Sequence, residues 1–270
     1  MDDRPATRRS LLLIPLVAFF LTCRPVVSEQ PREEIVDCML GETAVKVLIR
    51  DWPGSSLSFI NLHDDENTSV AAAAEVLVEN GGRLVELRHD GTRYLSFVES
   101  GIECQFDPNR MFTDAGARKT LEAQGCTSST AVAAVRQFAR RILKLYRFDE
   151  LALVVTLHNN GEEGYSLESY LEGGIYADDA ARVHYESGTD PDDFFFVTDP
   201  GLFEILSGEG LNVVLQDNDK VTDDGSLSVL AGPAGIPYIN VEAEDGHLQQ
   251  QVEMIKTVYS AAAALKAAGH

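Results

Sequence analysis

The stretch LALVVTLHNN, residues 151–160, decides the fold class of this 270-residue chain. Its first seven residues are almost all leucine or β-branched, which is typical of a strand buried on both faces of a sheet. The sequence ends this run abruptly in polar residues. Comparable strands are predicted over residues 44–49, 56–62, 194–198, 212–215 and 238–241.

Helical patterns alternate with these strands, over residues 68–79, 129–145 and 248–268. Buried strands that alternate with helices indicate a mostly parallel or mixed sheet with helices on both faces. No internal repeat or flexible linker divides the chain after its first 28 residues. We therefore predict a single three-layer α/β domain over residues 29–270.

One local signal predicts a hairpin within this pattern. The segments 83–88 and 93–98 both have strand character, and they flank His89-Asp90-Gly91. An Asp-Gly pair between two such segments is a typical hairpin turn, so we expect the two segments to pair with each other.

Residues 1–28 are predicted to be an export signal. Arg8 and Arg9 precede an apolar run over residues 11–21, which is shorter than the roughly 20 apolar residues that span a bilayer. A simply cleaved signal, a twin-arginine signal and a lipoprotein signal with a lipid anchor on Cys23 all fit this segment. Each predicts an extracytoplasmic protein that is periplasmic, secreted or lipid-anchored, and we expect no membrane span.

The overall charge excludes some classes of partner. The chain has 22 Lys and Arg residues against 43 Asp and Glu residues, a formal net charge of −21. A sequence-independent nucleic-acid binder needs cationic side chains to neutralise phosphates, so nucleic acid is excluded as a partner. An anionic membrane surface is unfavourable for the same reason.

Three cysteines follow the signal: Cys38, Cys104 and Cys126. In an oxidising compartment this number allows one disulfide. A Cys104–Cys126 bridge would close a short loop and is our prediction. Buried free thiols are the alternative.

Three predicted strands end in residues that can bind metal or transfer protons. The first runs into His63 and Glu66, the 151–157 strand into His158, and the last into Glu242. In open α/β sheets, ligands bind beyond the carboxyl ends of the strands, so we expect these four side chains to gather at one edge. Two imidazoles and a carboxylate form a zinc site with an open position, and the remaining carboxylate could act as a base.

These residues resemble the motifs of the zinc carboxypeptidase superfamily, which includes the succinylglutamate desuccinylase–aspartoacylase branch. The resemblance is carried by four anchors in order: Leu62-His63-Asp64-Asp65-Glu66, Phe106-Asp107-Pro108-Asn109-Arg110, Val155-Thr156-Leu157-His158 and Tyr238-Ile239-Asn240-Val241-Glu242. They spread over most of the chain after the signal. The resemblance implies a zinc carboxypeptidase-like fold and one Zn²⁺ ion bound by His63, Glu66 and His158.

The resemblance also implies a role for each remaining anchor residue. Glu242 would be the general base for the attacking water, and Glu244, two residues along the same strand face, is its rival. Arg110 would stabilise the developing oxyanion or bind a substrate carboxylate. Asn109 would help to orient the substrate.

The sequence departs from the carboxypeptidases in one region. Those enzymes have a tyrosine shortly before the catalytic glutamate, whereas residues 217–237 contain none, and only Ser226 and Ser228 offer hydroxyl groups there. This difference favours amide hydrolysis in general over specificity for a terminal carboxylate. The acidic run over residues 217–224 is expected to be a solvated loop or a shield at the entrance of the site.

The sequence therefore predicts an exported zinc metallohydrolase, carboxypeptidase-like, that cleaves an amide bond in a peptide such as a cell-wall peptide. One alternative is an N-acyl amino acid deacylase of the desuccinylase–aspartoacylase type. Another is a non-catalytic binding lipoprotein that keeps the fold. The substrate side chain and the oligomeric state are left open.

Overall fold

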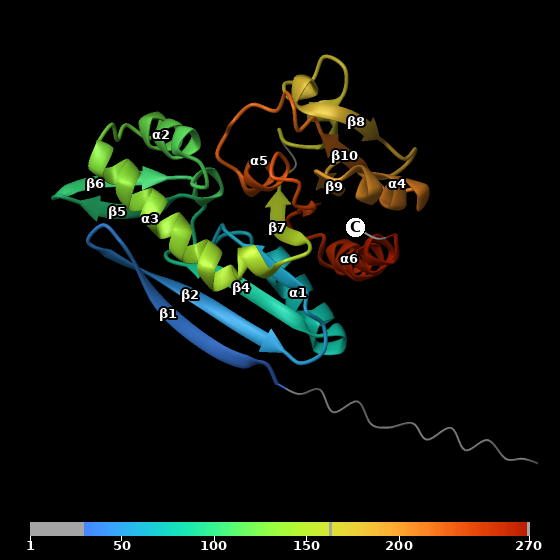
Figure 1. Ribbon diagram of the computed structural model, residues 1–270, viewed down its shortest axis with the longest axis horizontal. Coiled ribbons are helices and arrows are strands. Elements are labelled where there is room, and N and C mark those ends of the chain that lie inside the picture. Colours follow the sequence, from blue (N-terminus) through green and yellow to red (C-terminus); the bar gives the residue numbers. More distant parts are fainter. Residues whose placement is uncertain (1–29, 162–163, 269–270) are drawn as a thin grey trace, which may run out of the picture.

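The computed structural model describes residues 30–161 and 164–268, so the predicted export signal and Cys23 lie outside the described residues. In the described part, the chain forms a nine-stranded mixed sheet and a two-stranded hairpin (Figure 1). From edge to edge the sheet contains β1 (Arg32–Leu40), β2 (Thr43–Trp52), β4 (Gly82–Arg88), β3 (Ser58–Asn61), β7 (Val154–Asn160), β11 (Tyr238–Glu244), β9 (Phe194–Val197), β10 (Val213–Gln216) and β8 (Ala180–His184). The hairpin consists of β5 (Leu95–Glu99) and β6 (Ile102–Phe106).

Helices cover both faces of the large sheet. The helices are α1 (Asn67–Asn80), α2 (Asp114–Ala123), α3 (Ser129–Tyr146), α4 (Pro200–Gly208), α5 (Leu227–Ala231) and α6 (Leu248–Ala267), with 3₁₀ turns η1 (Pro108–Arg110), η2 (Phe148–Glu150), η3 (Leu167–Tyr170) and η4 (Ala177–Asp179). One face packs on α1, α4 and α6 through a core that includes Val76 and Ile255. The opposite face packs on α2, α3 and α5 through residues such as Phe138 and Leu227. The three-layer α/β class predicted from the sequence is confirmed.

The three predicted helices are present with nearly the predicted bounds. Helices α1, α3 and α6 each begin and end within one residue of the ranges expected from the sequence. Gly81 follows α1 with a positive φ of 74°, a conformation that glycine adopts without steric cost, and its N–H bonds Leu77 O. Of the helices in the described ranges, none combines the length and the apolar character that a bilayer crossing requires.

The predicted hairpin over residues 83–98 is wrong. Strand β4 pairs with β2 on one side and with β3 on the other, whereas β5 pairs with β6. All but the last residue of β4 are buried, so the strand needs a neighbour along each edge and has no edge left for β5. The turn signal is real, but it directs the chain away from the sheet and into a separate hairpin.

The direction of three central strands determines at which edge of the sheet the candidate site residues lie. Strand β3 runs parallel to β7, and β11 also runs parallel to β7 with Glu242 opposite His158. Their carboxyl ends therefore meet at the same edge of the sheet, which is where ligands bind in folds of this kind.

The structure pairs Cys104 with Cys126, as the short loop predicted, and among the described residues Cys38 is buried without a disulfide partner. The bridge joins β6 to the segment that follows α2. Between its two ends lies η1, with Asn109 and Arg110. The disulfide thus holds together the segment that carries two of the candidate site residues.

Removing this disulfide is expected to lower the free energy of unfolding by about 3 kcal/mol. The bridged cysteines are 22 residues apart in the sequence. Closing a loop of that length removes conformational entropy from the unfolded chain, which raises its free energy by about 3 kcal/mol. Urea unfolding of the wild type and of a Cys104→Ala/Cys126→Ala variant, with and without reductant, measures the effect. Reductant should destabilise only the wild type. An unchanged wild-type midpoint in reductant would show that the bridge does not stabilise the fold.

Candidate metal centre

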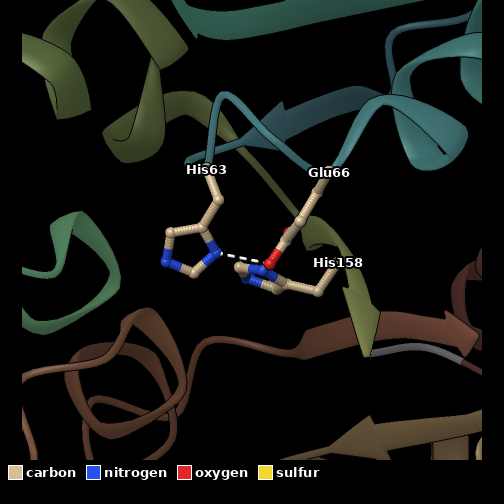
Figure 2. Close-up of side chains that lie close together, drawn as sticks. All are labelled: His63, Glu66 and His158. Carbon is tan, nitrogen blue, oxygen red and sulfur yellow. Dashed lines mark hydrogen bonds and ion pairs between the residues drawn. The ribbon is translucent and has the colours of Figure 1, made fainter. Parts of the chain in front are cut away.

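Three side chains converge at the carboxyl ends of β3 and β7 (Figure 2). His63 lies just after β3, Glu66 is the residue that precedes α1, and His158 lies within β7. All three are at least 95% buried. The parallel pairing of β3 with β7 brings these residues together although they are far apart in the sequence.

The donor atoms of the three residues face one another. His63 Nδ1 lies 2.6 Å from Glu66 Oε1, and His158 Nδ1 lies 2.8 Å from Glu66 Oε2. One ligand atom from each residue lies within 4.8 Å of the others. Two imidazole nitrogens and a carboxylate that meet in this way form the donor set of a catalytic zinc site.

A second carboxylate, that of Asp107, contacts the other ring nitrogen of His63. His63 Nε2 donates a hydrogen bond to Asp107 Oδ1 at 2.8 Å. A carboxylate in this position fixes the ring orientation and keeps the Nε2 proton in place, so the Nδ1 lone pair is available to a metal. The residues present therefore fit a zinc ion.

The electrostatics show that a positive charge is favoured at this point. Burial opposes charge on His63, but the carboxylates of Glu66 and Asp107 outweigh it and raise the pKa of His63 to about 9. Burial also opposes charge on Glu66, yet the two histidines hold the pKa of Glu66 well below its usual range. Burial lowers the pKa of His158. A metal cation can replace the proton that this cluster otherwise holds.

Glu242 lies beside this cluster without joining it. It is 4% exposed on β11, and its Oε2 accepts a hydrogen bond from Asn240 Nδ2 at 2.8 Å. Burial, together with the charge of Glu66, raises the pKa of Glu242 to about 8. A carboxylate with a pKa near neutrality is suited to accepting and returning a proton.

The rival carboxylate is placed differently. Glu244 Oε2 pairs with His247 Nε2 at 3.2 Å, and the Glu244 N–H bonds Asp193. Glu242 lines the same cavity as Glu66 and His158, whereas Glu244 does not. The geometry therefore favours Glu242 as the candidate base.

A cavity of about 720 Å³ opens onto the metal ligands. Asn109 and Arg110, from η1, line it together with Glu66, His158 and Glu242, as the sequence led us to expect. Ser226 and Ser228 also line it, and their hydroxyl oxygens lie 3.0 Å apart. Of the site residues proposed from the sequence, Glu66, Asn109, Arg110, His158 and Glu242 thus line one cavity, and His63 contacts Glu66 at its edge.

Sequence reasoning missed Arg93, the cation nearest the metal ligands. Arg93 Nη1 donates to Glu66 Oε1 at 3.0 Å, and Nη2 approaches Asp107 Oδ2 at 3.5 Å. The side chain remains 41% exposed and lines the cavity. Arg93 lies in a segment that the sequence pattern assigned to a hairpin, and for this reason it was not recognised as a site residue. Asp107 stands within one of the four anchors, but the sequence offered no role for it.

Tyrosine hydroxyls reach the cavity from a region where we had not expected them. Tyr165, Tyr170 and Tyr176 lie between β7 and β8 and line one side of the cavity. The hydroxyls of Tyr165 and Tyr170 lie 2.8 Å apart. The absence of tyrosine from residues 217–237 therefore does not leave the cavity without phenol groups.

Comparisons with known proteins find likeness only in the fold. No family model matches the chain, and no curated protein sequence matches it significantly. A candidate metallopeptidase from Shewanella denitrificans OS217 is 13% identical, with a TM-score of 0.38 over 87% of this chain and 82% of the other. Bovine thrombin-activatable fibrinolysis inhibitor, solved with a tick carboxypeptidase inhibitor, is 11% identical, with a TM-score of 0.44 over 88% and 91%.

A third solved structure belongs to another branch. An aspartoacylase family protein from Mesorhizobium loti MAFF303099 is 14% identical, with a TM-score of 0.41 over 90% of this chain and 69% of the other. The three descriptions name a metallopeptidase, a fibrinolysis inhibitor in complex with a carboxypeptidase inhibitor, and an aspartoacylase family protein.

Proposed function

We propose that this protein is a zinc-dependent hydrolase that cleaves an amide bond in a small peptide. One observation carries the proposal: the Nδ1 atoms of two histidines and the carboxylate of Glu66 converge, and an unligated carboxylate, Glu242, lines the same cavity. A three-residue donor set that leaves a coordination position open, next to a separate base, is the arrangement of a zinc hydrolase rather than of a structural zinc site.

His63, Glu66 and His158 would hold the metal. When bound there, zinc supplies a polarised carbonyl and a water that ionises near neutral pH. Asp107 keeps the ring of His63 in its orientation. The protein's own contribution is then to position the substrate, to move a proton and to stabilise negative charge.

Glu242 would accept the proton of the attacking water and deliver it to the leaving nitrogen. Arg93 is the guanidinium that contacts the ligand Glu66, so we assign it the stabilisation of charge on the carbonyl oxygen. Asn109 would orient the substrate. This assignment moves the oxyanion role from Arg110, which the sequence had suggested, to a residue that lies closer to the metal ligands.

The size of the cavity favours a small substrate. About 720 Å³ lies within the range of small-molecule sites and can hold a short peptide. If residues 1–28 export the protein, an extracytoplasmic peptide, including a cell-wall peptide, is the substrate that it would meet. An N-acyl amino acid would use the same chemistry and is therefore part of the test below.

Hydrolysis of a defined panel tests the proposal. Zinc-loaded protein would be incubated with short peptides, with their N-acylated forms, and with N-acetyl and N-succinyl amino acids, and the release of new amine followed. We expect cleavage of at least one peptide, loss of the activity on removal of zinc by a chelator, and recovery on adding zinc back. A zinc-loaded protein that cleaves no member of the panel would overturn the proposal and favour a binding protein.

A further inference from the structure

An ion pair occupies the side of the cavity where the sequence resemblance would place a substrate carboxylate. Arg110 Nη1 lies 3.0 Å from Asp224 Oδ2, and both residues line the cavity. Asp224 belongs to the acidic run that the sequence predicted to be a solvated loop or a shield. The other oxygen of Asp224 accepts a hydrogen bond from the N–H of Ser226 at 2.9 Å. Both oxygens of this carboxylate are therefore engaged.

The backbone around Asp224 is held against Arg110. Gly225 follows Asp224 with a φ of +86°, and a Cβ built on it would lie 2.3 Å from the carbonyl oxygen of Arg110. The N–H of Phe112 also bonds the carbonyl of Gly225 at 2.9 Å. A close approach of this kind is possible only for glycine. Asp224 is consequently a fixed neighbour of Arg110 and not the tip of a freely moving loop.

The other cation beside the metal ligands is also paired. Arg93 contacts the carboxylates of Glu66 and Asp107. Lys119, on α2, lines the cavity too, but it is exposed. Within the described ranges, each guanidinium that lines the cavity thus already has a carboxylate partner. A substrate carboxylate brought to Arg110 would lie close to Asp224 and be repelled by it.

An uncharged substrate group meets a different environment at the same place. Asn109 precedes Arg110, and its side-chain oxygen is buried without a hydrogen-bond partner among the described residues. That oxygen can accept a hydrogen bond from an amide N–H, whereas it has nothing to offer a carboxylate. The pairing of Arg110 and the unsatisfied acceptor on Asn109 favour the same kind of ligand.

We propose that Asp224 is a specificity residue that disfavours substrates with a free carboxylate beside Arg110 and so selects an uncharged group there, such as a primary amide or a continuing peptide chain. This inference rests on the proposed function, because it concerns the substrate of the same cavity. It works by repulsion of the wrong ligand as much as by attraction of the right one.

Binding of a matched acid and amide tests this role. The probes are N-acetyl-L-tyrosine and N-acetyl-L-tyrosinamide, whose aromatic ring suits a cavity lined by Tyr165 and Tyr170. Their affinities for zinc-loaded wild type and Asp224→Asn protein would be measured by isothermal titration calorimetry. Asparagine keeps the acceptor for the N–H of Ser226 and replaces the oxygen that faces Arg110 with an uncharged NH2 group, so both the charge and the ion pair are removed. We expect Asp224→Asn to bind the acid about tenfold more tightly and to change the affinity for the amide less than twofold.

A variant in the same loop controls for the general loss of negative charge. Asp219 is exposed and does not line the cavity, so Asp219→Asn should leave both affinities within about twofold of the wild type. Circular dichroism would verify that each variant is folded. An acid-to-amide affinity ratio that is unchanged or lowered in Asp224→Asn would overturn the inference, since Asp224 would then merely position Arg110. Amine release is recorded separately, so a failure of catalysis bears on the proposed function and leaves this ratio measurable.

Discussion

Replacing His63 with alanine is expected to abolish stoichiometric zinc binding and to lower kcat/KM by about 10³-fold or more on any substrate that the wild type cleaves. The variant removes one of three ligands, and a catalytic metal supplies several kcal/mol of transition-state stabilisation. It also leaves Glu66 and Asp107 without the imidazole that lies between them. Elemental analysis of the purified protein measures the metal, and the assay on the substrate panel measures the activity.

Two further variants make this result interpretable. His158→Ala removes a ligand that does not contact Asp107, and it should lose zinc to a similar degree. His184→Ala is the matched control, because His184 pairs with Glu186 at 3.4 Å and does not line the cavity. It should keep one zinc per chain and full activity. A His63→Ala protein that is folded and still holds one zinc would show that the metal is not bound where we place it.

The strand ends could be predicted from the sequence because they depend on a simple regularity. An apolar run that stops at a polar residue indicates where a buried strand emerges, and parallel neighbours emerge at the same edge. For this reason the grouping of His63, His158 and Glu242 follows from the sequence alone. The register then places Glu242 directly opposite His158.

The surroundings of the cavity could not be predicted in this way. Arg93 reaches Glu66 because the turn before it is tied down by Asp64, whose carboxylate accepts hydrogen bonds from the N–H groups of His89 and Gly91. No local periodicity encodes that contact. Local turn chemistry at the same place instead indicated a hairpin, which is excluded because β2 and β3 already pair with the two edges of β4.

The pairing of Arg110 with Asp224 illustrates the same limit. The sequence marked Arg110 as a functional residue and the acidic run as a loop, and it offered no reason to connect them. Their contact depends on the close approach of Gly225 to the backbone at Arg110 and Gly116, which are distant in the chain. Functional detail of this kind arises from packing between loops, where propensity and pattern carry little information.

Replacing Glu242 with glutamine is expected to eliminate hydrolysis while making the metal-free protein more stable. The variant keeps the shape of the side chain and the zinc ligands, so it should still bind one zinc, but it cannot accept the proton of the attacking water. We expect kcat to fall by about 10³-fold. The retained zinc distinguishes this variant from His63→Ala.

The gain in stability follows from the direction of the pKa shift. Burial and the charge of Glu66 raise the pKa of Glu242 from 4.5 to about 8, so the folded protein keeps this proton after the unfolded chain has released it. The free energy of unfolding therefore falls as the pH rises from about 4.5 to about 8, and glutamine escapes the loss. In urea unfolding of metal-free protein, the free energy of unfolding of Glu242→Gln should exceed that of the wild type by about 5 kcal/mol at pH 9 and by little at pH 4.5.

The rival carboxylate provides the control for both measurements. Glu244 lies outside the cavity and pairs with His247, so Glu244→Gln should retain activity and should not reproduce the stability gain at high pH. If Glu244→Gln were inactive and Glu242→Gln active, the base would be Glu244. A stability gain confined to Glu242→Gln would show that the charged Glu242 side chain lowers the free energy of unfolding until a metal or a substrate compensates its charge. Glu242 would then be a residue kept for chemistry and not for stability.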